Sequence, residues 1–410
     1  MKKEQITIKT KETAIKIKNT SVNAVRIKDI VKKGVRVYDQ DKIGIAGSIG
    51  GISEEELLNQ AKQNLTAGIP YPYELAAQRK DHRNYQKENP SSEELLSKTE
   101  AILKMLREEY SDFDFSETIR TQHVTHQMSN SEGLDLEYQD AWTDLGFIFK
   151  TKKSVNLFDG FLSFTGRTFN IEEVFATSRK ILNAYRNPLE LPDADTLPIV
   201  TLHFRELHQF LCKSLNGENY ANGSSIFSGK LQEKLFNEKI RLEQNRDPRY
   251  HADKFFDAEG SVLHEDRCQL IEKGQLIKVL SDKKTSALYR LPHTGSASGS
   301  YDDIPSLTGA PLRFATDSSD LKASLNGQLA ALVMISAGGD FTSDGNFAAP
   351  VQASFLFDGT DILGRLPEFS VQSNIYQMLG KDYIGTFDNT QLTLGDFPSQ
   401  FQVYRMKVKP

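Results

Sequence analysis

The sequence has only two cysteines, Cys212 and Cys268, one tryptophan and no long apolar segment in its 410 residues. Two cysteines exclude a disulfide framework in a chain of this length. The longest apolar run, from Leu329 to Ile335, is too short to cross a bilayer, and no apolar segment follows the basic start as it would in a signal peptide. We therefore expect a cytoplasmic protein without a membrane partner.

The charge balance excludes a generally basic nucleic-acid-binding protein. The net charge is -5, with 38% hydrophobic and 26% charged residues, which is typical of a soluble globular chain. The first 33 residues are rich in lysine, but the lysines alternate with isoleucine and valine, as in Lys16 and Ile17. This alternation predicts strands with one solvent-facing side. We expect no nucleic-acid partner.

Capping residues and turns predict the elements of the N-terminal part. Ser53, Ser91 and Asn170 each precede a helical apolar stripe and have a glutamate three residues later, which predicts three helices. A charged loop is expected from Tyr71 to Asn89. Strands are expected at Val35 to Tyr38, Ile43 to Ala46, Thr118 to Met128, Leu134 to Tyr138 and Leu145 to Lys150.

Three prolines, Pro188, Pro192 and Pro198, interrupt the periodicity and predict a domain boundary. Beyond them, turn dipeptides at Lys273-Gly274 and Asp358-Gly359 lie between apolar runs and predict hairpins. The small-residue segment from Gly295 to Ser300 is expected to be a mobile loop. The sequence thus predicts an α+β protein, with an N-terminal mixed α/β domain over residues 1–193 and a β-rich domain over residues 194–410.

The segment from His208 to Gly229 reads HQFLCKSLNGENYANGSSIFSG, and its GSSIFSG tail resembles the segment after the H-E-x-x-x-H helix of the TldD/PmbA family. These metallopeptidases were once called modulators of DNA gyrase. The alignment implied by the tail places His208, Gln209 and Lys213 at the first histidine, the glutamate and the second histidine. Gln209 cannot accept a proton from metal-bound water, and an ammonium group at Lys213 repels a dication.

The resemblance also implies a C-terminal cysteine that completes the zinc site, and this chain has no cysteine after Cys268. We therefore expect His208, Gln209 and Lys213 to be degenerate motif positions, with no catalytic residue and no metal ligand in this chain. Zinc is expected only in a catalytic partner.

Other candidate ligands have a simpler structural interpretation. His203 and His208 would point about 140° apart on a helix, with Glu206 between them, so they favour an ordinary helix face. His123 and His126 would lie on opposite faces of a strand. The candidate acid/base pair, Asp257 and Glu259, lies in an FDAEG turn, where capping of the backbone is the commoner use.

The resemblance implies a non-catalytic, PmbA/TldE-like subunit of a zinc metallopeptidase complex that processes or degrades unfolded peptides. Its expected partner is a TldD-like chain in a heterodimer, or a second copy when the chain is alone. Two alternatives stay open. The chain could be an active metallopeptidase with other ligands, or a stand-alone peptide-binding scaffold that captures extended chains at a sheet edge.

Overall fold

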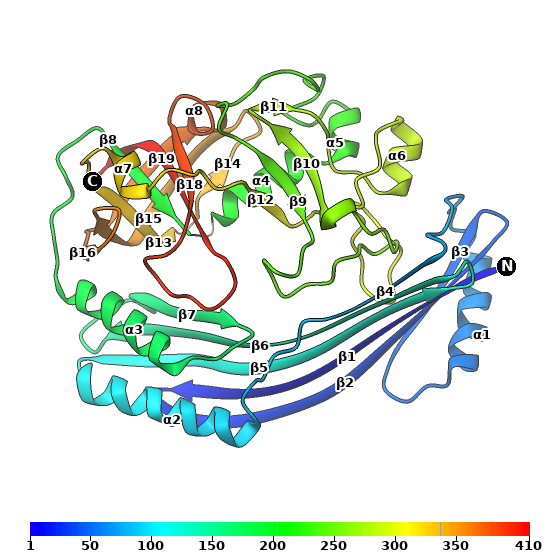
Figure 1. Ribbon diagram of the computed structural model, residues 1–410, viewed down its shortest axis with the longest axis horizontal. Helices are drawn as coiled ribbons and strands as arrows, with labels where there is room; N and C mark the ends of the chain where they lie inside the picture. Colours follow the sequence, from blue (N-terminus) through cyan, green and yellow to red (C-terminus); the bar gives the residue numbers. More distant parts are fainter. Residues whose placement is uncertain (203, 337) are drawn as a thin grey trace.

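The computed structural model describes residues 1–202, 204–336 and 338–410. The α+β class predicted from the sequence is confirmed: a long sheet built by the N-terminal half runs along one side of a β-rich C-terminal half (Figure 1). None of the described helices is both long and apolar enough to cross a bilayer.

The N-terminal half contains one seven-stranded sheet in the order β3-β2-β1-β5-β6-β4, with β7 also paired to β6. Its pairs are antiparallel except for β4 and β6. The strands are β1 (Lys2–Lys18), β2 (Ser21–Asp39), β3 (Lys42–Ile49), β4 (Arg79–Asn84), β5 (Phe113–Asn130), β6 (Leu134–Thr151) and β7 (Gly160–Gly166).

The lysine-rich start forms two of these strands, as predicted. Near the end of β1, Ile15 and Ile17 are buried whereas Lys16 and Lys18 are exposed, because successive side chains of a strand point to opposite faces. The β2–β3 hairpin is also confirmed, and its turn residues Gln40 and Asp41 both have positive φ. Paired positive φ values give the turn geometry that matches strand twist.

The three predicted N-terminal helices are confirmed: α1 (Glu54–Asn64), α2 (Ser92–Glu109) and α3 (Ile171–Arg186), with the 3-10 turn η1 (Leu65–Ala67) after α1. At the N-termini of these helices, Ser53, Ser91 and Asn170 accept hydrogen bonds from backbone amides. Ser91 and Glu94 together form a complete capping box. Helices α2 and α3 lie side by side on the sheet (Figure 1), where an Arg179–Glu109 ion pair joins them.

Three expectations for local structure are wrong. The two strands expected at Leu134 to Tyr138 and Leu145 to Lys150 form one strand, β6, because β5 pairs with it throughout. The charged segment from Tyr71 to Asn89 contains β4, which pairs with β6. The segment from Gly295 to Ser300 is held in place: Ser296 is fully buried and the Gln244 side chain donates to the Thr294 and Gly295 carbonyls.

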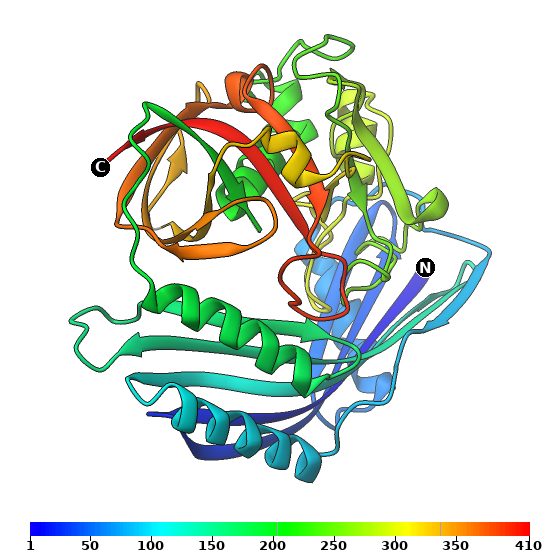
Figure 2. The same cartoon turned by 60° about the vertical axis from the view of Figure 1, so that its left-hand side comes forward.

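The C-terminal half contains a curved eight-stranded sheet and a smaller four-stranded sheet. The strand β13 pairs with both β8 and β15, so the larger sheet closes into a ring through β8, β19, β17, β15 and β13 (Figure 2). Its members are β8 (Thr196–Thr201), β13 (Ala330–Ser336), β14 (Asp340–Phe341), β15 (Asn346–Phe357), β16 (Ile362–Arg365), β17 (Phe369–Asn374), β18 (Tyr383–Asp388) and β19 (Gln400–Lys409).

The smaller sheet has the order β11-β10-β9-β12 and ends on the open edge of β12. It consists of β9 (Leu242–Asn245), β10 (Arg267–Glu272), β11 (Gln275–Leu276) and β12 (Leu312–Phe314). The remaining short elements are α4 (Arg205–Ser214), α5 (Gly217–Ala221), α6 (Lys283–Tyr289), α7 (Leu321–Leu325), α8 (Ile375–Met378) and η2 (His264–Asp266). The predicted hairpins at Lys273-Gly274 and Asp358-Gly359 are confirmed.

One hydrophobic core joins the two halves. It includes Ile15 and Phe149 from the long sheet together with Val200 and Phe355 from the ring, all nearly inaccessible to solvent. A second core lies within the C-terminal half and holds the apolar side of α4. Since the first core is shared, the division into residues 1–193 and 194–410 stays a prediction.

Candidate functional site

Helix α4 follows strand β8 directly and carries the motif that the sequence singled out. Leu207, Phe210 and Leu211 are buried in the C-terminal core, as their helical spacing predicts. His208, Gln209 and Lys213 lie on the exposed side of the helix. Of these three residues, only His208 lines the neighbouring cleft.

The His208 side chain contacts the backbone of β12 and the side chain of Cys212. Its Nε2 lies 3.4 Å from the amide nitrogen of Leu312 in β12, which donates to the ring. One helical turn later, the Sγ of Cys212 lies 3.8 Å from Nδ1. Burial lowers the pKa of His208, against a backbone hydrogen bond from the ring to Ala310 that raises it. The neutral ring is the form that can accept from an amide.

The side chains around His208 do not match the ligands of a catalytic zinc ion in a peptidase. Such a zinc needs three protein ligands and a carboxylate base. Over residues 1–202, 204–336 and 338–410, no third histidine, cysteine or carboxylate joins His208 and Cys212 within 4.8 Å. Burial raises the pKa of the Cys212 thiol, which disfavours the thiolate that metals bind. We derive no metal chemistry from this site.

A cleft of about 380 Å³ lies beside α4. Its walls come from segments far apart in the sequence: the start of α4, the turn after β9, the edge strand β12 and the chain entering β19. The residues that sequence reasoning missed are Tyr250, His251 and Arg313, which line this cleft. No local pattern marks them, because only the packing of the small sheet against α4 brings them together.

The other histidines considered from the sequence, His123 and His126, do not belong to a group of three potential metal ligands among the described residues. His203 lies outside the described residues. Glu206 lines a different, mostly apolar cavity of about 120 Å³, which shares Leu202 and Phe204 with the cleft that His208 lines. On β5, His123 is exposed and His126 is largely covered, in keeping with opposite faces of a strand. Partial desolvation and the Lys11 charge lower the pKa of His123, and burial lowers the pKa of His126.

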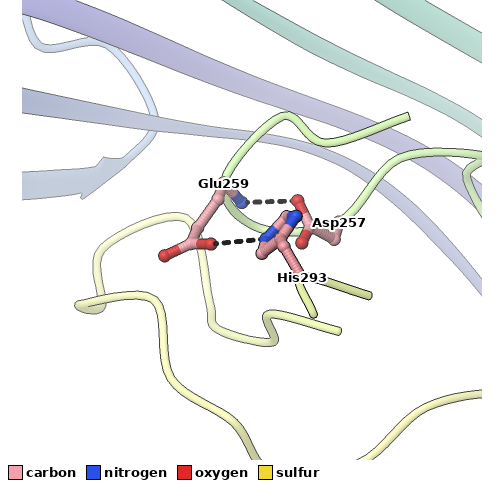
Figure 3. Close-up of side chains that lie close together, drawn as sticks. All are labelled: Asp257, Glu259 and His293. Carbon is pink, nitrogen blue, oxygen red and sulfur yellow. Dashed lines mark hydrogen bonds and ion pairs between the residues drawn. The ribbon is translucent and has the colours of Figure 1, made fainter. Parts of the chain in front are cut away.

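Asp257, Glu259 and His293 form the one group of three potential metal ligands found among the described residues (Figure 3). Asp257 accepts from the amides of Glu259, Ser261 and Ala297 at 2.8–3.1 Å. The two Glu259 oxygens accept from the Tyr71 hydroxyl and the Lys283 amide. The carboxylate oxygens therefore already bind protein donors, and the capping interpretation of this turn agrees with the structure.

A His208→Ala variant tests the structural role of this side chain. The change removes one hydrogen bond to a backbone amide, so we expect a loss of only about 0.5–1.5 kcal/mol in the free energy of unfolding. Urea denaturation measures the loss, and the exposed neighbour Gln209→Ala is the control. A much larger loss, or loss of activity in an intact complex, would show that His208 does more than bind Leu312.

The family of this chain follows from its C-terminal half. Residues 202–409, about half of the chain, match the model of the PmbA/TldA metallopeptidase C-terminal domain. The chain belongs to the PmbA/TldD family. No curated protein sequence gives a significant match to it.

Solved structures share the fold over the whole chain. TldE from Thermococcus kodakarensis has a TM-score of 0.75 at 17% identity, with 100% of this chain and 97% of that chain covered. A candidate modulator of a DNA gyrase from Thermotoga maritima has a TM-score of 0.78 at 16% identity, with 100% and 96% covered. Another, from Bacteroides thetaiotaomicron, has a TM-score of 0.76 at 13% identity, with 100% and 94% covered.

Proposed function

We propose that this chain is a non-catalytic, TldE-like subunit of a cytoplasmic zinc metallopeptidase complex that acts on unfolded peptides. The observation that supports the proposal is that Gln209 and Lys213, the residues at the positions that the resemblance assigns to the motif, lie on the exposed side of helix α4. Neither side chain can replace the glutamate or the histidine of H-E-x-x-x-H. The catalytic zinc is then held by a TldD-like partner.

A partner interface is supported by exposed apolar side chains on the loop between β6 and β7. Val155 is 99% exposed and Leu157 is 88% exposed, with Phe158 next to them at 38%. Apolar side chains that gather on an exposed loop are a common feature of protein interaction sites. We expect this loop to contact the partner subunit.

Co-expression with a relative from the same genome that has an intact H-E-x-x-x-H motif tests the proposal. We expect one gel-filtration peak that contains both chains, because a specific interface of at least about 1,000 Å² normally survives this separation. Zinc should copurify with the complex and not with this chain alone. Leu157→Asp should weaken the association, with Leu288→Asp, on another exposed surface, as the control.

Two separate peaks, with full peptidase activity in that of the relative alone, would refute the proposal. Zinc bound stoichiometrically to this chain alone would instead favour an active metallopeptidase with other ligands.

Restoring the motif by Gln209→Glu together with Lys213→His is not expected to create a peptidase. The two positions lie outside the cleft lining, and incomplete, unsupported ligand sets usually bind metal weakly. Zinc content after dialysis and hydrolysis of unfolded casein are the measurements. Casein hydrolysis that a chelator abolishes would contradict this prediction.

A further inference from the structure

The cleft beside α4 is positively charged through its two arginines, since burial lowers the pKa of both of its histidines. Two arginines, Arg205 and Arg313, and two histidines, His208 and His251, are among its lining residues, and none of the described lining residues is an aspartate or a glutamate. A cleft lined by charge of one sign attracts ligands of the opposite sign. Its volume of about 380 Å³ lies within the range of small-ligand sites.

Arg313 is the best placed of these groups. Its guanidinium lies 4.2 Å from the centre of the Tyr250 ring and donates to the Pro398 carbonyl at 3.2 Å. These contacts hold the side chain against one wall. Over the described part of the chain, no carboxylate lies within 4.0 Å of Arg313 or Arg205, and the acidic groups that influence Arg313, Asp388 and Glu243, lie farther away.

His251 adds a second unused group. Its side chain lines the same cleft, and its buried Nε2 has no hydrogen-bond partner among the described residues. Buried polar atoms are nearly always paired, so the unpaired Nε2 beside the cleft is an exception that a bound water or ion would account for. His208, in contrast, is already bound to the Leu312 amide.

The remaining wall is apolar. Leu207 and Leu211 of α4 and Phe204 before it line the cleft together with Leu202 and Phe314. The cleft therefore offers an apolar surface next to a half-buried guanidinium that has no ionic partner among the described residues. An arginine in such a position matches the two oxygens of a carboxylate.

We propose that this cleft binds the terminal α-carboxylate of a peptide whose last residue is apolar, with Arg313 and Arg205 as the anion-binding groups. The inference rests on the proposed function, which supplies unfolded peptides as ligands. It assigns this chain a part in substrate binding at the place where the metal chemistry of the family is absent.

Fluorescence anisotropy of the full-length chain with a labelled pentapeptide ending in leucine tests the inference. We expect saturable binding of the free acid, and binding of the C-terminal amide weaker by about tenfold or more, since charge-assisted hydrogen bonds are lost. Arg313→Gln and Arg205→Gln should each weaken binding of the free acid and remove most of its advantage over the amide. Arg26→Gln, an exposed arginine on the N-terminal sheet, is the control and should bind as the wild type does.

Arg205 is exposed, so its variant keeps the test valid if Arg313→Gln does not fold. A third peptide, amidated and with an internal glutamate, separates a side-chain carboxylate from the α-carboxylate. Binding of this peptide as tight as that of the free acid would overturn the assignment to the chain terminus. Equal binding of acid and amide, or no binding of either, would overturn the carboxylate site. The binding test uses this chain alone, so a negative result would not contradict the proposed TldD-like partner. If the two chains do not assemble on co-expression, a positive binding result would still hold.

Discussion

Replacing Arg36 with methionine is expected to lower the free energy of unfolding by about 3–5 kcal/mol, the cost of breaking a buried ion pair. The Arg36 side chain has no measurable exposure, and its Nη1 donates to Glu4 at 2.9 Å and to the Ala258 carbonyl at 2.7 Å. Burial raises the pKa of Glu4, and the Arg36 charge opposes that rise. Without Arg36, the Glu4 carboxyl and the Ala258 carbonyl stay buried and lose their donor.

Urea denaturation measures this effect, and Arg179→Met is the matched control. Arg179 pairs bidentately with Glu109 at 2.6–2.7 Å, but 44% of its side chain is exposed. Exposed pairs contribute about 1 kcal/mol or less, so this control should lose little stability. Equal losses of stability in Arg36→Met and Arg179→Met would contradict the importance of burial. The double variant Glu4→Leu/Arg36→Met should recover part of the stability that Arg36→Met loses.

Acidification is expected to destabilise the protein through His126. Burial lowers the pKa of His126 to about 4 from its ordinary value of 6.5, and Lys254 adds to the effect while Asp253 opposes it. Below pH 6.5 the unfolded chain binds this proton and the folded chain does not. The stabilisation is therefore complete above about pH 6.5 and is lost as the pH falls towards 4, by at most about 3 kcal/mol.

Urea unfolding of the wild type and of His126→Gln at roughly pH 7 and pH 4.5 measures this dependence. The variant should lose less stability on acidification than the wild type does, because it has no imidazole to protonate. His264→Gln changes an exposed histidine and should follow the wild type. Parallel curves for wild type and His126→Gln would show that other groups cause the acid sensitivity.

Much of the fold could be predicted because its signals are local. A serine or asparagine followed by a glutamate three residues later is enough to begin α1, α2 and α3, since the cap binds amides of its own helix. The alternation of lysine and isoleucine is enough to specify the solvent side of β1. The interruption expected within β6 was wrong because a polar sequence can continue a strand when a neighbouring strand, here β5, pairs with it throughout.

Part of the candidate site could likewise be predicted from the sequence, and part could not. The chemical loss at Gln209 and Lys213 is a property of residue type, so the sequence alone indicates it, while their status as degenerate motif positions stays a prediction. The cleft with Arg313 and His251 depends on β12 packing beside α4, across about a hundred residues of chain. Such long-range packing produces no recognisable local sequence pattern around Arg313 or His251.

The sequence by itself therefore determined the helix starts and the hairpin turns, because each depends on groups a few residues apart. The departure from zinc-peptidase chemistry is a prediction from residue type at Gln209 and Lys213. Only the tertiary structure decided that Gly295, Ser296 and Ala297 are buried and that Asp257 and Glu259 bind backbone and side-chain donors. It also decided that two arginines line a cleft whose described lining residues include no aspartate or glutamate. In each case the partners come from distant segments, and burial of the shared core brings them together.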